Sequence, residues 1–321
     1  MKISIIIPNY NGINYIENCL HALERQTYKS FEIIVIDNAS TDGSYEIINN
    51  YSCLTKVIQL DKNYGFSKAV NEGIKRADGD YIVLLNNDTE VDKDWLLELV
   101  KCIEDDDKIF SCSSMMIRAD EREKIDDAGD EYNIFGWSHK RGEGTSIKKY
   151  NTNRMVFSSC GGASIYRKKI FDEIGYFDEN FFAYMEDVDL SYRARINGYK
   201  NVYCSKAIVY HIGSATSGSK YNSFKVKLSA RNNIYTVYKN MPLIQLIINL
   251  PFLILGFLIK GVFFSIKGLG KEYFNGIIEG FKGLKNIKKT KFRLKNLMNY
   301  FIIEFEMIIN TFKYVFEKIF V

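Results

Sequence analysis

Short apolar runs alternate with amphipathic stretches along the first hundred residues, and this alternation restricts the fold more than any other feature. Four runs have the length and β-branched composition of buried strands: 3–8, 32–37, 56–60 and 81–86. Between the first two, apolar side chains recur at helical spacing: Ile13, Ile16, Leu20 and Leu23. Strands and helices that take turns along a chain are typical of a mostly parallel sheet flanked by helices. We therefore predict an α/β fold.

The second part of the chain is less regular and continues the same domain. We expect short strands at 110–117 and 202–210, and a helix that begins near Glu186 and ends at Gly198. These elements predict one catalytic domain over 1–240. Residues 1–109 would form its nucleotide-binding half, and 110–240 its acceptor-binding half.

Polar residues follow three of the predicted strands at the point where each strand ends. They are Pro8-Asn9-Tyr10-Asn11-Gly12, Asp37 to Gly43, and Asn86-Asn87-Asp88. In an open α/β sheet, ligands bind outside the carboxyl ends of the strands, so these residues are the first candidates for a site. No G-x-G-x-x-G motif follows any of these strands, which argues against a dinucleotide-binding dehydrogenase.

Asp88 directly follows an apolar strand. A carboxylate there can bind a hard divalent cation that also binds substrate phosphates. Asp88 and Thr89 can equally begin a turn or cap the helix near Trp95.

Asp37 ends the second strand, where its carboxylate can accept a hydrogen bond from a pyrimidine N–H, and Asp42 can aid the same pocket. The segment Ser40-Thr41-Asp42-Gly43 also has the composition of a plain turn and helix cap. Both interpretations remain open from the residues alone.

Glu186, Asp187 and Asp189 lie within four residues at the start of a predicted helix, after an aromatic segment. Acidic residues there can complement the helix dipole. A partly buried acidic pair beside aromatic rings can also present a general base.

His211 ends the apolar run 207–210 and is one of three histidines. It can be structural, or it can bind a metal or a diphosphate if strand 202–210 lies beside Asp88.

Taken together, these residues resemble the family-2 glycosyltransferases with the GT-A fold, particularly their bacterial rhamnosyltransferase-like branch. The resemblance covers roughly 1–240. It rests on six motifs in order: 5–12, 35–44, 63–66, 84–88, 186–190 and His211.

The resemblance implies Asp37 at the nucleotide base, Asp88 and His211 at a divalent cation, Mn2+ or Mg2+, and Asp187 as the base that activates the acceptor with inversion. Glu186 would orient the acceptor, and Gly161 and Gly162 would line its site. The remaining nucleotide-binding residues would be Pro8, Asn9, Tyr10, Asn11, Asp42, Asn63, Gly65 and Asn87. The usual D-x-D motif reads Asn86-Asn87-Asp88 here, so it offers one carboxylate. The donor would be a nucleotide diphosphate sugar, with rhamnose as one candidate sugar.

The C-terminal region 241–321 is apolar and then basic. Residues 243–266 are strongly apolar but are interrupted by Gln245, Asn249, Pro251 and Lys260, which makes a bilayer span borderline. Seven basic residues follow without an acidic one: Lys282, Lys285, Lys288, Lys289, Lys291, Arg293 and Lys295. We expect a helical region that associates with an anionic membrane surface, peripherally or monotopically. The alternative is that 243–266 packs on the catalytic domain as a helical hairpin and the lysines are solvated.

The N-terminal segment and the cysteines favour a location at the cytoplasmic face of the cell membrane. The N-terminal apolar run is too short for a signal peptide. The six cysteines include no C-x-x-C pair, so neither a zinc site nor a disulfide framework is indicated. We expect a glycan or lipid-linked acceptor in cell-surface glycan synthesis, and no nucleic-acid partner.

Two alternative functions remain open from the sequence. A sugar nucleotidyltransferase should carry a glycine-rich and basic phosphate loop after the first strand, where this chain has Pro8 to Gly12. A catalytically silent, membrane-bound assembly subunit would not require Asp88 and Asp187, and a test for donor turnover would separate it from an enzyme.

Overall fold

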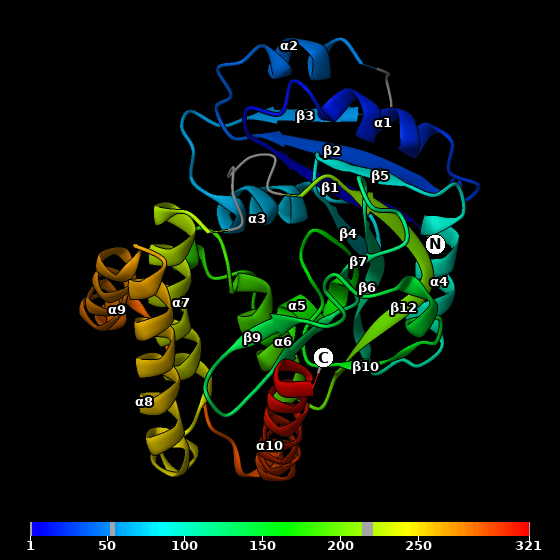
Figure 1. Cartoon of the computed structure of the whole chain (residues 1–321). Coiled ribbons are helices and arrows are strands. Elements are labelled where there is room, and N and C mark those ends of the chain that lie inside the picture. Colours follow the sequence, from blue (N-terminus) through cyan, green and yellow to red (C-terminus); the bar gives the residue numbers. More distant parts are fainter. Residues whose placement is uncertain (1, 52–54, 214–220, 321) are drawn as a thin grey trace.

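The computed structural model describes residues 2–51, 55–213 and 221–320. Its first part contains the predicted alternation (Figure 1). The elements are β1 (Ile3–Asn9), α1 (Ile16–Glu24), β2 (Phe31–Asp37), α2 (Ser44–Asn49), β3 (Thr55–Gln59), α3 (Phe66–Arg76), β4 (Tyr81–Leu85), β5 (Thr89–Val91) and α4 (Trp95–Glu104). All four expected strands are confirmed to within one or two residues.

The following part carries shorter strands and the helices that cover them. It consists of β6 (Ile109–Arg118), β7 (Ile125–Asp127), β8 (Asp130–Tyr132), β9 (Ser138–Lys140), β10 (Arg154–Val156), β11 (Ala163–Arg167), α5 (Lys168–Ile174), α6 (Glu186–Ile196) and β12 (Lys200–His211). The predicted helix at Glu186 and the two predicted strands are present. Gly198 follows the end of α6 with φ +85°, a left-handed conformation that favours glycine.

One mixed sheet forms the centre, with the strand order β10-β12-β6-β11-β4-β1-β2-β3. Strands β3, β2, β1 and β4 are mutually parallel, whereas β11 runs antiparallel to both β4 and β6. The sheet is therefore parallel from β3 to β4 and mixed beyond β4. At its far side, β5 pairs with β12 and β7 pairs with β6.

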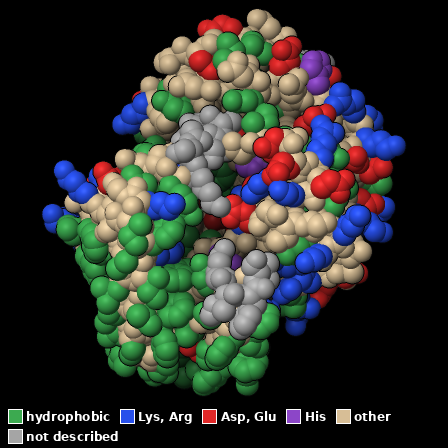
Figure 2. All heavy atoms as spheres, in the orientation of Figure 1, with side chains coloured by type: hydrophobic (Ala, Val, Ile, Leu, Met, Phe, Trp, Pro, Cys, Tyr) green, Lys and Arg blue, Asp and Glu red, His purple; other side chains and the backbone are tan. Residues whose placement is uncertain are grey.

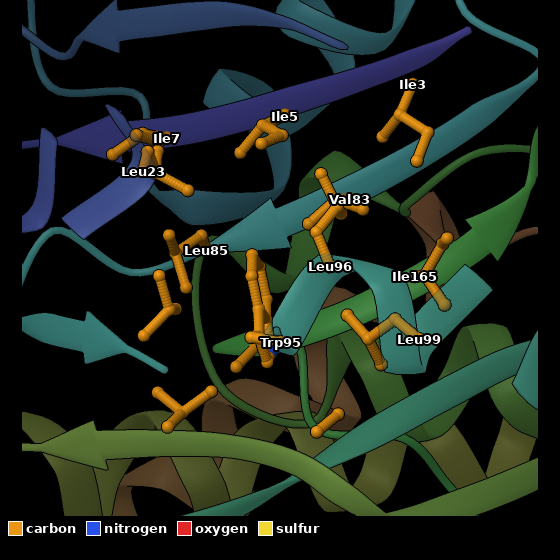
Figure 3. Close-up of a cluster of buried hydrophobic side chains, with 14 of the residues drawn as sticks. Ile3, Ile5, Ile7, Leu23, Val83, Leu85, Trp95, Leu96, Leu99 and Ile165 are labelled. Carbon is orange, nitrogen blue, oxygen red and sulfur yellow. The ribbon is translucent and has the colours of Figure 1, made fainter. Parts of the chain in front are cut away.

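Helices cover both faces of the sheet. Successive residues of β1 point to opposite sides of the sheet, so each face receives apolar side chains that pack against helices. Ile5 and Ile7 pack in a cluster with α1 and with Trp95 of α4 (Figure 3). Ile6 packs in a second cluster with α3, α5 and α6. This burial explains why the parallel strands are almost continuously apolar.

The C-terminal part is helical, with α7 (Ser223–Asn240), α8 (Leu243–Ile266), α9 (Gly270–Gly283) and α10 (Leu297–Phe320). Helix α8 is one continuous helix that contains Pro251. Among the described residues, it alone is long and apolar enough to cross a membrane. Helices α7, α8 and α9 lie beside one another, and α10 packs near α6 and β8.

Candidate active site

Asn9 connects the polar loops at the carboxyl ends of β1, β2 and β4. Its Nδ2 donates to Asp37 Oδ1 at 3.0 Å and to Ser44 Oγ at 2.9 Å, and its Oδ1 accepts from Asn87 Nδ2 at 2.6 Å. These groups are buried. Three of the predicted nucleotide-binding residues, Asn9, Asp37 and Asn87, therefore form one hydrogen-bonded unit.

Asp37 is fully buried, and its second oxygen accepts from the Ser40 N–H at 3.0 Å. Asn11 joins the same two loops, because its backbone N–H donates to Ser40 Oγ and its Oδ1 accepts from the Thr41 N–H, both at 2.9 Å. Pro8 and Tyr10 are half-buried at the end of β1.

Asp42 binds the protein's own loops. Its carboxylate accepts from the backbone N–H groups of Ile13 and Ser44, at 2.9 and 3.0 Å, and from the Ser44 hydroxyl at 2.6 Å. Burial alone would raise the pKa of Asp42, but these hydrogen bonds outweigh it and lower the pKa. Asp42 thus has the turn and cap contacts that its sequence context also allowed.

Asn63 and Gly65 shape the loop after β3. Asn63 Oδ1 accepts from Asn38 Nδ2 at 3.0 Å and from the Gly65 N–H at 2.9 Å. Gly65 has φ +83°, and a Cβ built there would lie 2.5 Å from the carbonyl oxygen of Phe182. Only glycine fits this approach, which brings the loop against the segment that precedes Glu186.

Asp88 and His211 lie close together where β5 pairs with β12. His211 Nε2 lies 3.4 Å from Asp88 Oδ1, and its Nδ1 lies 2.8 Å from Asp126 Oδ2. Burial alone would lower the pKa of His211, but the hydrogen bonds to Asp126 and Asp88 raise it to about 9. The sequence predicted His211 as a possible ligand only if its strand lies beside Asp88. The structure places the two residues in contact.

This pair suits a divalent cation that substrate also binds. A carboxylate oxygen and an imidazole nitrogen are suitable donors, and Asp126 orients the ring as outer partners of metal-binding histidines do. The described residues contain no group of three or more His, Cys, Asp or Glu that could hold a metal ion. A cation here would need oxygens from substrate phosphates and water, which is the usual situation for Mg2+.

Sequence reasoning missed the acidic residues of β7 and β8. Asp126 also binds Lys140 of β9, at 3.0 Å. Asp127 is 1% exposed, and its Oδ2 has no hydrogen-bond partner. Burial is the main reason that the pKa of Asp127 is raised to about 6, and it also raises the pKa of Asp130. The signal in the sequence was three aspartates within 126–130.

Asp187 faces a glycine turn. Its Oδ2 accepts from the Gly161 N–H at 3.0 Å, and its Oδ1 accepts from the Val188 N–H at 2.8 Å. Burial raises the pKa of Asp187 despite these bonds. Burial also raises the pKa of Glu186, which is 6% exposed and has no partner for its Oε2. These two carboxyl groups are therefore stronger bases than ordinary ones.

Gly161 and Gly162 connect the segment that carries Asp187 to the segment that carries Asp88. The Gly162 carbonyl accepts from the Asn86 N–H at 2.8 Å, so the turn that holds Asp187 is bonded to the strand end that carries Asp88. A Cβ at Gly162 would lie 3.1 Å from Asn86 Nδ2, and one at Gly161 would lie 3.2 Å from the Phe66 ring. Small residues allow this close approach.

Asp189 differs from its neighbours. It is completely buried and binds Arg193 at 2.8 Å, Lys239 at 3.0 Å and Asn240 at 2.8 Å. Burial would raise the pKa of Asp189, but Arg193 and Lys239 lower it to about 2. Its contacts are those of a structural ion pair.

The segment before Glu186 is strained and is held from α7. Phe182, Tyr184 and Met185 all have positive φ, between 64° and 72°. Asn232 of α7 donates to the carbonyl oxygens of Phe181, Ala183 and Tyr184, at 2.7 to 2.9 Å. Non-glycine residues adopt such backbone only when their surroundings impose it, and this is frequent at functional sites.

The fold is the GT-A fold of solved glycosyltransferases. The glycosyl transferase family 2 model matches residues 4–175, and the chain belongs to this family.

Relatives by sequence agree with this family. The uncharacterized glycosyltransferase YwdF of Bacillus subtilis is 29% identical over 250 residues, which are 73% of this chain and 85% of YwdF. The poly(ribitol-phosphate) beta-N-acetylglucosaminyltransferase TarS of Staphylococcus aureus is 33% identical over 110 residues, which are 33% of this chain and 19% of TarS. The chain spans half or less of the length of the first curated relatives that it matches.

Solved structures share the fold. GalNAc-T7 with UDP, GalNAc and Mn2+ has a TM-score of 0.59 and 20% identity, over 72% of this chain and 47% of that chain. TarS 1–349 with UDP-GlcNAc has a TM-score of 0.54 and 20% identity, over 94% of this chain and 79% of that chain.

Proposed function

We propose that this glycosyltransferase moves a sugar from a nucleotide diphosphate donor to a hydroxyl of a lipid-linked or polysaccharide acceptor, with inversion, in cell-surface glycan synthesis. The observation that carries the proposal is the bonded path from Asp88 through Asn86, Gly162 and Gly161 to Asp187. It sets a candidate diphosphate site and a candidate base on the two sides of one turn. Relatives such as TarS, which acts on poly(ribitol phosphate), support a cell-surface polymer.

Asp187 is the proposed general base. Each of its oxygens accepts one backbone hydrogen bond, and a carboxylate oxygen can accept two, so capacity remains for the acceptor hydroxyl. Burial raises the pKa of Asp187, which strengthens it as a base. The deprotonated hydroxyl would attack the anomeric carbon opposite the diphosphate, and this displacement inverts the configuration. Glu186, Gly161 and Gly162 would line the acceptor side.

Asp88 and His211 are the proposed ligands of a Mn2+ or Mg2+ ion, with Asp126 orienting the imidazole. When bound, the cation would neutralise charge on the leaving diphosphate. The Mn2+ in the structure of GalNAc-T7 supports this expectation for the fold.

Asp37 is proposed to hold the nucleobase. Its two oxygens each accept one side-chain or backbone hydrogen bond within the protein, which leaves capacity for a base N–H. Asn9, Asn11, Asp42, Asn63 and Asn87 would keep the surrounding loops in place, and Pro8, Tyr10 and Gly65 would complete the pocket walls. The likeness to the rhamnosyltransferase-like branch makes a thymidine diphosphate sugar one donor to test.

We also propose two functional regions, a catalytic domain over 1–240 and a membrane-association region over 241–321. The protein would act on the cytoplasmic face of the cell membrane. The long apolar helix α8 and the basic residues that follow it support this localisation.

A thermal-shift screen tests the proposed activity. The purified protein is heated with uridine, thymidine, guanosine or cytidine diphosphate, with and without Mn2+ or Mg2+. A ligand that binds only the folded state raises the melting temperature. A metal-dependent shift with uridine or thymidine diphosphate is expected and would be followed by an assay of donor turnover. No shift with any nucleotide would contradict the proposal and favour a catalytically silent subunit.

A further inference from the structure

Helix α8 has an inverted polarity pattern. A surface helix of a water-soluble protein buries its apolar side and exposes its polar side. In α8 the buried residues include Gln245 and Asn249, which donate to Glu304 Oε2 of α10 at 2.8 and 2.9 Å. The opposite side carries Ile244, Ile247, Ile248, Leu258, Val262 and Ile266, which are 57% to 81% exposed. The polar side of this helix therefore faces protein.

The inward side of α8 contacts protein at points spread along the helix. Gly256 lies against β8–β9 loop residue Phe135, where a Cβ would be 2.7 Å from the carbonyl oxygen. Nearer the C-terminal end, Gly261 lies against Phe274 of α9, where a Cβ would be 2.8 Å from the ring. Together with Gln245 at the beginning, these contacts hold α8 against the molecule along most of its length. Its apolar side is exposed over the same length.

Helices α9 and α10 repeat this pattern. In α10, Ile303 and Met307 are buried with Tyr132 of β8, whereas Phe301, Phe305 and Phe312 are 63% to 72% exposed. In α9, Gly276 and Gly280 pack closely on α7, and Phe281 is 61% exposed. Figure 2 shows apolar side chains gathered over α8, α9 and α10, with few charges among them. We name these outward sides of the three helices the apolar face.

A basic segment, 284–296, connects α9 to α10, two of the helices whose outward sides form the apolar face. Within the described part of the chain, Lys288, Lys291 and Arg293 form no ion pair with a carboxylate. Phe292 lies between Lys291 and Arg293, and Leu294 lies between Arg293 and Lys295; these two side chains are 48% and 78% exposed. Basic and exposed apolar side chains in alternation suit the boundary between anionic headgroups and acyl chains.

We propose that the apolar face lies in one leaflet of an anionic lipid bilayer, with the axis of α8 parallel to the membrane plane, so that α8 does not cross the bilayer. This inference rests on the proposed membrane association and defines its geometry. An α8 that crossed the bilayer would carry its own Lys260 into the hydrocarbon, together with the Glu304 carboxylate that Gln245 binds. Lys260 Nζ lies 5.1 Å from the Trp137 ring centre, on the protein side of the helix. With α8 in the plane, these polar groups stay on the protein side.

The depth of α8 is measured on the full chain bound to phosphatidylglycerol vesicles. Single spin labels at Ile248, Leu255 and Val262, in a variant without other reactive cysteines, report the depth of each position from collisions with oxygen and a nickel chelate. We expect three similar, shallow depths. A steady change of depth that passes through the middle of the bilayer would overturn the proposal.

The nature of the occupant is tested with a charge on the apolar face and a matched control. Leu255→Glu should weaken binding to phosphatidylglycerol vesicles at least tenfold, whereas Met155→Glu, at a 50% exposed position on β10, should not. Lys288→Gln with Lys291→Gln should weaken binding to phosphatidylglycerol and leave the weaker binding to phosphatidylcholine unchanged. Equal binding by Leu255→Glu and the parent would overturn the proposal.

A second copy of the chain could also cover the apolar face. In that case the parent would be a dimer without vesicles, Leu255→Glu would be a monomer, and neither would bind lipid; that result also overturns the proposal. The nucleotide thermal shift is recorded for each variant. It tests the proposed activity and the fold independently of lipid binding, so the two proposals can fail separately.

Discussion

His211 Nε2 lies 3.4 Å from Asp88 Oδ1, although the two residues lie far apart in the chain. The contact follows from sheet pairing, because Thr89, next to Asp88, pairs with His211 in the antiparallel β5–β12 ladder. Strand β12, from the second part of the chain, therefore completes a candidate site that begins at the end of β4.

Replacing either residue should remove metal-dependent donor binding. For Asp88→Asn and His211→Ala we expect the Mn2+-dependent gain in affinity for the nucleotide diphosphate to fall at least tenfold, since each variant loses one of the two proposed protein ligands. Isothermal titration with and without Mn2+ measures this gain. Glu121→Gln is the control and should keep this gain, because Glu121 lies on the surface and pairs, among the described residues, with Arg118 and Lys124. An unchanged gain in both site variants would rule out this metal site.

Asp126→Asn should lower the metal affinity of the same site, because Asp126 contacts His211 and not the cation. The loss of an outer partner of a metal-binding histidine typically costs about 10- to 100-fold in metal affinity. Asp127→Asn on the same strand is the matched control, because Asp127 accepts from the Gly129 N–H and does not bind His211. Mn2+ titration of both variants in the presence of nucleotide measures the difference. Equal losses in both would mean that the effect comes from general damage to β7.

Asp187→Asn should abolish transfer while leaving donor binding nearly intact. The loss of a general base costs about 10²- to 10⁴-fold in kcat. The nucleotide affinity should stay within about twofold, because the removed charge acts on the acceptor hydroxyl. Steady-state kinetics and nucleotide titration separate the two quantities. Substantial residual transfer would exclude Asp187 as the base.

Asp189→Asn should damage stability instead. Breaking a fully buried ion pair costs about 3 kcal/mol or more, and Arg193 and Lys239 would both lose this partner. Urea unfolding measures the loss. Asp187→Asn is the control and should be much less destabilised. A stable Asp189→Asn variant would show that the pair contributes little.

The pH dependence of stability should also trace to Asp189. Its pKa is lowered from 3.8 to about 2 in the folded state, so its contribution of about 2 kcal/mol is complete above pH ~4 and is lost as the pH falls toward 2. Urea unfolding at several pH values should show this acid loss in the parent and a smaller one in Asp189→Asn. Identical slopes would contradict the assignment.

The acid limb of the pH–rate profile should lie above the range of an ordinary aspartate. Burial raises the pKa of Asp187, and a general base works only when deprotonated, so kcat should rise with pH through that raised pKa. Lys140 opposes this shift electrostatically, so Lys140→Met should move the limb to higher pH. A profile that is flat down to pH ~4 would contradict the role of Asp187.

Local pattern was sufficient for the parallel strands and the polar residues that follow them. Strand 3–8 and strand 32–37 are read from a few adjacent residues, and their carboxyl ends meet because parallel neighbours end at the same edge. The same reasoning led to Asp37 and Asp88 as candidates, whereas Asp187 came from the acidic cluster at a helix start and from the family resemblance. It did not reach Asp126, because the role of that residue depends on the pairing of β7 with β6 beside β12.

By itself, the sequence determined the α/β class, the acidic edge and a C-terminal region that is apolar and basic, since periodicity and composition are local properties. Tertiary structure decided which residues meet: His211 with Asp88, Asp189 with Lys239, and Gln245 with Glu304 so that α8 turns its apolar side outward. The physical reason is that burial and charge pairing depend on segments far apart in the chain. The sequence of a helix shows which of its faces are polar and apolar. The elements that pack against the helix decide which face is covered.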